Sequence, residues 1–275
     1  MRSSRALARL VAVSLVAFAV LAPVASGAEP PAKGHLVLIG GGDKPPEVMR
    51  KFVELAGGKG SPIIAIPTAS SEPDAAEYYE KLFREELGCT DAVSLRIRSR
   101  ADAQRPDYVA LARKARGIFF GGGDQVRIVN ALLGTPVGDA IAAAFAGGAA
   151  VGGTSAGTAC QSEKMLTGEG DFSQVRTRSV ELWQGLGFLP SDVVVDQHFL
   201  RRQRQNRLLS VVLENPGLLG VGVDEETAIW VRPDGTFQVL GRSGVMVFDA
   251  KGAAVSRQPK ESGQAMPPRK WTGKR

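Results

Sequence analysis

Short apolar runs alternate with segments of helical periodicity through most of this chain. Runs rich in β-branched residues predict strands at about residues 35–40, 62–67, 92–97, 117–120, 149–153, 192–197 and 218–223. Helices are predicted between them, at about 45–57, 74–87, 107–115, 124–133, 137–147, 156–165 and 199–213. This alternation is typical of an α/β fold with three layers, in which a mostly parallel sheet has helices on both faces.

The pattern changes near the end of the chain. Apolar runs at 228–231 and 236–240 are separated by Arg-Pro-Asp-Gly at 232–235, which is typical of a turn, and residues 241–244 turn again into a run at 245–248. We therefore expect antiparallel strands to close the domain. The stretch from Leu166 to Leu189 is polar and glycine-spaced, and we interpret it as a linker that can cover a site.

The first residues have the pattern of an export signal. Three arginines precede an apolar stretch at 10–21, and Ser26-Gly27-Ala28 is a small-x-small cleavage site. The apolar stretch is short for a membrane span. We expect residues 1–28 to be removed, and the mature protein to be exported to the periplasm or the medium without a membrane anchor.

Charge is unevenly distributed along the chain. The net charge is +6, but residues 1–28 contribute +3 and residues 251–275 contribute +6, so the body over 29–250 carries −3. We expect the basic tail at 251–275 to be solvated and flexible. The body, which we take as the catalytic domain, shows no basic stripe for nucleic acid, and its mild acidity favours a cationic substrate.

A glycine-flanked serine marks the candidate chemistry. Gly-Thr-Ser-Ala-Gly at 153–157 directly follows a predicted strand, as in a nucleophile elbow, which exposes the serine Oγ on a sharp strand-to-helix turn. The N–H groups of Ala156 and of a glycine near Gly123, in the glycine run after the strand at 117–120, are the expected oxyanion donors. An ordinary tight turn is the alternative for both glycine-rich segments.

The sequence limits the choice of a base and an acid for Ser155. It has two histidines: His35 opens the first strand, where a structural role is expected, whereas His198 ends a strand, where the sites of open α/β sheets lie. Asp196 and the run at 224–226 are the candidate acids, but Asp196 is too close to His198 along the strand. Only one of two adjacent side chains in the run can face His198. The order Ser, His, acid differs from that of α/β-hydrolases.

Two further groups of residues were weighed. Cys89 and Cys160 are the only cysteines, and no cysteine–histidine spacing suits a structural zinc. Whether the two cysteines pair stays open. The arginines that follow His198 are either a solvated helix face or a cluster that binds substrate carboxylates.

Together these segments resemble the cyanophycinase family over about residues 34–250. The resemblance rests on Gly-Gly-Thr-Ser-Ala-Gly at 152–157, Phe-Phe-Gly-Gly-Gly-Asp-Gln at 119–125, Asp-Gln-His-Phe at 196–199 with its spaced arginines, and Val-Asp-Glu at 223–225. It implies a flavodoxin-like, class I glutamine amidotransferase-like sheet. It also implies a serine peptidase triad of Ser155, His198 and Glu225, and substrate contacts by Gln125, Asp196, Gln197, Arg202, Arg204 and Arg207.

The family releases β-Asp-Arg dipeptides from cyanophycin, a polyaspartate with arginine joined to each β-carboxyl. By that resemblance we expect acyl transfer from the polymer to Ser155, with neither a metal ion nor an organic cofactor. The export signal and the basic tail depart from intracellular members and indicate scavenging of external polymer. A dipeptidase of the same fold that cuts α- or isoaspartyl dipeptides, and a non-catalytic binding protein, are the alternatives. A homodimer is left open.

Overall fold

The computed structural model describes residues 34–170, 173–176 and 178–253. The predicted signal at 1–28 and residues 254–275 of the predicted tail lie outside the described residues. Within the described ranges, no single helix is long and apolar enough to cross a membrane. Helices α4 (Gln125–Leu132) and α5 (Pro136–Ala146) together reach the length and composition of a membrane span, but the pair is bent by 100° at the break between them.

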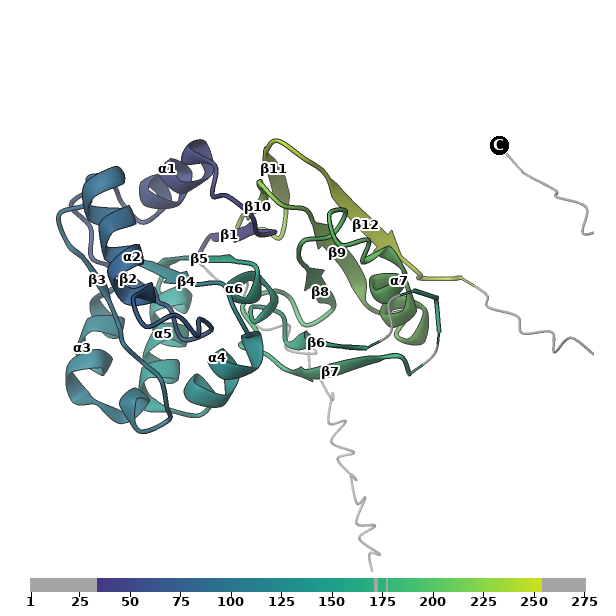
Figure 1. The fold of residues 1–275 in the computed structure, drawn as a ribbon, viewed down its shortest axis with the longest axis horizontal. Helices are drawn as coiled ribbons and strands as arrows, with labels where there is room; N and C mark the ends of the chain where they lie inside the picture. The colour runs from purple at the N-terminus through teal and green to yellow at the C-terminus, as the bar shows by residue number, and fades with distance from the viewer. Residues whose placement is uncertain (1–33, 171–172, 177, 254–275) are drawn as a thin grey trace, which may run out of the picture. The chain divides into compact units, whose positions relative to one another are not determined.

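The main sheet has seven strands in the order β11-β10-β1-β5-β4-β2-β3 (Figure 1). Its parallel part consists of β1 (Leu36–Ile39), β5 (Ala150–Thr154), β4 (Gly117–Phe120), β2 (Ile63–Ile66) and β3 (Ala92–Ser94). Two antiparallel strands extend it beside β1, namely β10 (Thr227–Val231) and β11 (Phe237–Gly241). The predicted mostly parallel sheet and the predicted antiparallel closure are both confirmed.

Helices cover both faces of this sheet because its strands are apolar on both sides. Leu36 and Leu38 of β1 belong to a core that includes residues of α3 (Pro106–Lys114), α4 and α5. Val37 and Ile39 belong to a second core, which includes residues of α1 (Pro46–Leu55) and α2 (Ala75–Lys81). Helix α2 continues as a π-helix at Leu82–Glu86. Successive side chains of a strand point to opposite faces, so one strand serves two cores. The fold is therefore the expected three-layer α/β architecture.

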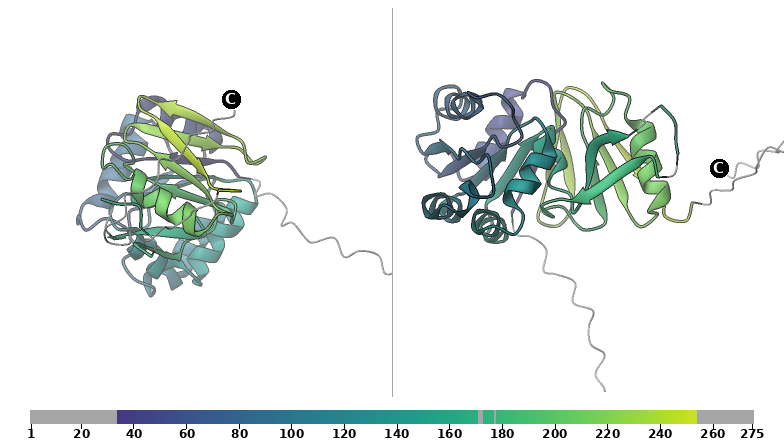
Figure 2. Two further views of the ribbon diagram at one scale, coloured as in Figure 1. Left: turned by 90° about the vertical axis from the view of Figure 1, so that its right-hand side faces the viewer. Right: turned by 60° about the horizontal axis from the view of Figure 1, so that its bottom comes forward.

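Strands β8 (Val193–Asp196) and β9 (Leu219–Val223) form a second sheet. They are parallel, and β12 (Val245–Asp249) pairs antiparallel with β9. Helix α7 (Gln205–Glu214) connects β8 to β9 and packs on this sheet (Figure 2). The sequence pattern did not separate these strands from the main sheet. Antiparallel β10 occupies the free edge of β1, so β8 and β9 pair elsewhere.

Two predicted helices are shorter than expected, and one predicted linker is wrong. The helix predicted at 156–165 is only α6 (Ala156–Ala159), and the region interpreted as a linker holds an antiparallel hairpin of β6 (Lys164–Gly170) and β7 (Val180–Gln184). Met165 and Leu166 are buried and anchor β6. The helix predicted at 199–213 begins only at Gln205, because Gln203 has a positive φ of 52°.

The two cysteines are buried, and the first histidine, His35, binds another side chain. Cys89 and Cys160 are both free and buried, so they form no disulfide in this structure. Burial raises the pKa of both thiols above the ordinary value. His35 accepts a hydrogen bond from the indole N–H of Trp230 at 3.1 Å through its Nδ1, in line with the structural role expected of it.

Candidate active site

Ser155 lies at the end of β5 in a strained turn. Its φ is 53° and its ψ is −113°, a conformation that residues other than glycine seldom adopt. Close packing explains the glycines on either side. A Cβ added at Gly153 would lie 2.1 Å from the Gly157 carbonyl oxygen, and one at Gly157 would lie 2.2 Å from that of Phe120. The turn therefore has the geometry of the expected nucleophile elbow, with strain stored at the half-buried serine.

Three side chains form a continuous hydrogen-bonded chain at this turn. Ser155 Oγ lies 2.8 Å from His198 Nε2, and His198 Nδ1 lies 2.6 Å from Glu225 Oε1. A carboxylate only accepts, so the imidazole proton belongs on Nδ1, which leaves Nε2 to accept the serine proton. The predicted nucleophile, base and acid are thus brought together in the geometry of a serine triad.

The backbone around His198 is held as tightly as its side chain. The residue has a φ of 49°, and its N–H donates to the Gly40 carbonyl oxygen at 2.6 Å. A Cβ added at Gly41 would lie 2.2 Å from His198 Cε1, so the imidazole packs directly on the Gly41 backbone. The glycine turn after β1 therefore supports the base.

Burial lowers the pKa of His198 below its ordinary value. The bond to Glu225 opposes this shift by raising the pKa, and the positive charges of Arg202 and Arg204 lower it further. The lowered pKa keeps the imidazole neutral at neutral pH, which is the form that accepts a proton from Ser155.

The acidic run divides its roles among its three members. Glu225 faces His198, whereas Glu226 turns away and lies 3.7 Å from Arg242. Asp224 accepts hydrogen bonds from the backbone N–H groups of Leu200 and Arg201 at 3.0 and 2.9 Å, and from Ser243 Oγ at 2.7 Å. Asp224 therefore secures the segment that follows His198, a role that sequence reasoning missed.

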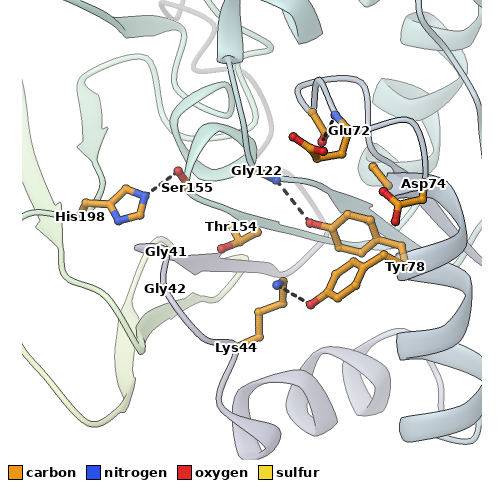
Figure 3. A pocket seen from close by; sticks show the side chains of 13 residues that line it. Gly41, Gly42, Lys44, Glu72, Asp74, Tyr78, Gly122, Thr154, Ser155 and His198 are labelled. Atoms are coloured by element: carbon orange, nitrogen blue, oxygen red, sulfur yellow. Dashed lines mark hydrogen bonds between the residues drawn. The ribbon is translucent and has the colours of Figure 1, made fainter.

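Ser155 and His198 open onto a cavity of about 410 Å³. Figure 3 shows the pair at one side of the cavity, with Glu72, Asp74 and Tyr78 opposite. The lining residues are Gly41, Gly42, Lys44, Ser70, Glu72, Asp74, Ala75, Tyr78, Tyr79, Gly122, Thr154, Ser155 and His198. The side chains at 44, 72, 74, 78 and 79 were not predicted from sequence. Glu72 and Asp74 lie on a loop beyond the carboxyl end of β2, and this position after a strand is the one sequence feature that could have indicated them.

Of the predicted oxyanion donors, Ala156 lies beside the nucleophile, and in the glycine run it is Gly122, next to the predicted Gly123, that lines the cavity. Ala156 follows Ser155 at the first position of α6, and a Cβ added at Gly122 would lie 3.5 Å from Ser155 Cβ. The Gly122 N–H faces the Tyr79 hydroxyl at 3.4 Å. In the described part of the chain, no acceptor lies within hydrogen-bond distance of the Gly123 or Ala156 N–H. Neither N–H thus has a partner among the described residues, and the role of Gly123 as an oxyanion donor stays a prediction.

The predicted substrate contacts divide into two groups. Asp196 and Arg207 are each 1% exposed and form a buried ion pair, in which Arg207 Nε donates to Asp196 Oδ2 at 2.9 Å and the terminal nitrogen donates to Oδ1. Gln125 is also buried and donates to the Leu166 carbonyl oxygen. None of the three lines the cavity. In this structure their polar groups bind other parts of the protein, and their role as substrate contacts stays a prediction.

The remaining predicted contacts lie nearer the triad. Gln197 Oε1 lies 3.4 Å from Ser155 Oγ. Arg204 is buried and donates to the Gln197 carbonyl oxygen at 2.8 Å, so it supports the residue before His198. Arg202 is exposed. Of the three arginines predicted to contact substrate, Arg202 is therefore the exposed one.

The family model described as Peptidase family S51 matches residues 36–239. The chain belongs to this family. It is 38% identical over 229 residues to a cyanophycinase of Synechococcus elongatus, covering 82% of this chain and 70% of that protein. It is 36% identical over 215 residues to a cyanophycinase of Nostoc sp., covering 78% and 72%. The protein is accordingly a serine-type peptidase, a hydrolase.

Solved structures of two peptidases share the fold. A peptidase from an acI-B1 Actinobacterium superposes with a TM-score of 0.64 at 25% identity, over 81% of this chain and 93% of that chain. A putative peptidase E from Listeria monocytogenes superposes with a TM-score of 0.54 at 19% identity, over 77% and 100%. The second likeness concerns the fold alone.

The described residues contain no cluster of three or more His, Cys, Asp or Glu side chains placed to hold a metal ion.

Proposed function

We propose that this peptidase degrades cyanophycin to β-Asp-Arg dipeptides through an acyl-enzyme. The observation that carries the proposal is the hydrogen-bonded chain from Ser155 through His198 to Glu225, which opens onto a cavity with charged walls. The similarity to proteins named cyanophycinase, at 34% to 38% identity, supports the choice of substrate.

The first half-reaction joins the substrate to Ser155. His198 Nε2 takes the Ser155 proton as Oγ adds to a backbone carbonyl carbon of an aspartyl residue. The N–H groups of Ala156 and Gly123 hold the oxyanion, and Glu225 orients the imidazole and stabilises its protonated form. The tetrahedral intermediate then expels the amine, which receives the proton from Nε2, and leaves an ester on Ser155.

The second half-reaction releases the product. Water adds to the ester carbonyl while His198 Nε2 takes a proton from it, and the second tetrahedral intermediate expels Ser155 Oγ, which recovers that proton. The resting triad is restored. The proton transfers between Oγ and Nε2 take place across the 2.8 Å contact between these atoms.

Incubation with purified cyanophycin, followed by mass analysis of the soluble products, tests this function. The wild-type protein should release β-Asp-Arg dipeptide, and Ser155→Ala should lose on the order of a million-fold in turnover. Turnover of α- or isoaspartyl dipeptides without turnover of polymer would instead select a dipeptidase of the same fold. Near-normal activity of a folded Ser155→Ala protein would end the serine mechanism.

We further propose that the protein acts outside the cytoplasm on polymer from the surroundings. The support is the charged and apolar start of the sequence with its small-x-small site at 26–28. N-terminal sequencing of the protein from its native host should begin near Glu29. A sequence that starts at Met1, in a cytoplasmic fraction, would contradict export.

A further inference from the structure

The chain passes between its two larger sheets at two short crossovers near the triad. Residues 224–226, the first crossover, run from β9 of the second sheet to β10 of the main sheet, and they include Glu225 (Figure 1). Residues 242–244, the second crossover, run from β11 of the main sheet to β12 of the second sheet. Ser155 follows β5 of the main sheet, whereas His198 follows β8 of the second sheet. The geometry of the triad therefore depends on how the two sheets are joined.

The backbones of the two crossovers are hydrogen-bonded to each other. The Asp224 N–H donates to the Gly244 carbonyl oxygen at 3.2 Å. The Arg242 N–H donates to the Glu226 carbonyl oxygen at 3.0 Å. The packing is close, because a Cβ added at Gly241, where φ is 104°, would lie 2.3 Å from that same carbonyl oxygen. The second crossover thus holds the residues on either side of the triad acid.

Ser243 in the second crossover binds the first crossover through both its backbone and its side chain. Its N–H donates to Thr227 Oγ1 at 2.8 Å, and this buried hydroxyl donates to the Glu225 carbonyl oxygen at 3.1 Å. The Ser243 hydroxyl donates to Asp224 Oδ2 at 2.7 Å. Ser243 itself is exposed, so a change of its side chain leaves the buried core intact.

The Asp224 carboxylate joins this crossover to the segment that carries the base. Its Oδ1 accepts from the N–H groups of Leu200 and Arg201, the second and third residues after His198. Burial alone would raise the pKa of Asp224, but hydrogen bonds from the Arg201 amide and the Ser243 hydroxyl lower it below its ordinary value. The side chain is therefore an ionised acceptor at neutral pH, with one oxygen on each segment.

We propose that Ser243 and Asp224 are positioning residues that hold the imidazole of His198 against Glu225. The proposal rests on the catalytic role proposed for the triad. Asp224 directly precedes the acid and binds the amides that follow the base, and the Ser243 hydroxyl fixes the orientation of its carboxylate. Without that hydroxyl, Oδ2 loses its donor and the carboxylate turns more freely. The contact of 2.6 Å between His198 Nδ1 and Glu225 Oε1 is then held less firmly.

The variant Ser243→Ala tests this role without changing any charge. The rate at which a small fluorophosphonate labels Ser155 at neutral pH should fall about ten-fold, because small displacements of catalytic groups are costly. The pKa of His198 should fall as well, since the hydrogen bond to Glu225 raises it in the intact site. Nuclear magnetic resonance of the imidazole nitrogens measures this pKa directly, because the chain has two histidines.

Two matched variants control for the loss of a surface hydroxyl. Ser243→Thr retains a hydroxyl at this position and should restore both the labelling rate and the pKa of His198. Thr236→Val removes an equally short bond, in which the hydroxyl donates to Asp234 Oδ1 at 2.7 Å in the turn at the other end of β10 and β11. It should label at the wild-type rate. An equal loss in Thr236→Val would overturn the proposal.

A second variant tests whether Ser243 acts through Asp224. Asp224→Ala frees the amides of Leu200 and Arg201 as well, so it should slow labelling more than Ser243→Ala does. Adding Ser243→Ala to Asp224→Ala should cause no further loss, because both changes break the same hydrogen bond. Additive losses in the double variant would overturn the proposed coupling.

The remaining outcomes separate this role from the serine mechanism. A Ser243→Ala protein that labels at the wild-type rate would overturn the positioning role and leave the mechanism intact. So would slower labelling with an unchanged pKa of His198, because the hydroxyl would then not act through the base. Absence of labelling in folded wild-type protein would overturn the catalytic role of the triad, and this proposal with it.

Discussion

At the scale of single residues, the acidic run after β9 shows how adjacent side chains divide their roles. Glu225 orients His198, Glu226 faces solvent near Arg242, and Asp224 fixes the two backbone amides that follow Phe199. Sequence reasoning established that only one of two neighbours can face the base, because side chains alternate along an extended chain. The resemblance then selected Glu225.

Glu225→Gln should be far more damaging than Glu226→Gln. An amide accepts from Nδ1 less well and does not stabilise the imidazolium, and loss of such an acid costs about ten-thousand-fold in kcat. Steady-state kinetics on cyanophycin measure the difference, with Glu226→Gln as the matched control. Similar activities for the two variants would remove Glu225 from the triad.

The exposed Arg202 should tune the base. Its positive charge contributes to the lowered pKa of His198, so Arg202→Gln should raise this pKa and move the acidic limb of activity to higher pH. Arg201, which is also exposed, makes no comparable contribution, and Arg201→Gln should leave the limb in place. The rate at which a small fluorophosphonate labels Ser155 from about pH 4 to pH 8 reports the limb without a polymer substrate. An unmoved limb in Arg202→Gln would contradict this electrostatic account.

The residues that line the far side of the cavity were the hardest to predict. Lys44, Glu72 and Tyr78 come from two segments that are distant in sequence, and neither segment contains a recognisable motif. Only the order of strands β1, β5, β4 and β2 brings them to one edge of the sheet. Periodicity predicts each strand but not which strands are neighbours.

At the scale of elements, the site depends on how β8 and α7 are joined. The turns over 199–204 replace the predicted first part of α7, since the amides of Leu200 and Arg201 bind Asp224 rather than a helical carbonyl oxygen. Arg207 in α7 then reaches Asp196 at the end of β8 and the Thr167 carbonyl oxygen of β6. Through Arg207, the ion pair thus connects α7, β8 and β6. Its other member, Asp196, lies two residues before His198.

Breaking this buried pair should destabilise the protein. Arg207→Met leaves the Asp196 carboxylate buried without its partner, which typically costs about 3–5 kcal/mol of unfolding free energy. Arg202→Met, the same change at an exposed position, should stay within about 0.5 kcal/mol. Denaturant unfolding measures both. Equal small effects would show that the pair does not hold these elements together.

At the scale of the whole molecule, alternating apolar and helical segments predicted the class of fold well. Strands buried on both faces produce continuous apolar runs, and the seven predicted runs coincide with β1–β5, β8 and β9. The second sheet was not predictable, because pairing is decided by long-range contacts that leave no local signal. The β6–β7 hairpin was missed because Gly168, Gly170 and the polar residues around them weaken the strand pattern.

The sequence indicated the positions of the triad residues better than it indicated what the predicted substrate contacts bind. The nucleophile follows β5 of the main sheet and the base follows β8 of the second sheet, so each lies at a strand end as expected, but the two strands belong to different sheets. Asp196 and Arg207 carry charges that sequence alone assigns as readily to a ligand as to each other. In the structure both side chains are buried and pair with each other, which the sequence alone did not indicate.

The measurement that tests the account most directly is covalent labelling of the folded protein with a small fluorophosphonate, followed by peptide mapping. The account predicts a single adduct on Ser155, no adduct in Ser155→Ala, and much slower labelling in His198→Gln, because Nε2 activates Oγ across 2.8 Å. Absence of labelling in folded wild-type protein, or an adduct on another residue, would contradict a catalytic role for the serine at the end of β5.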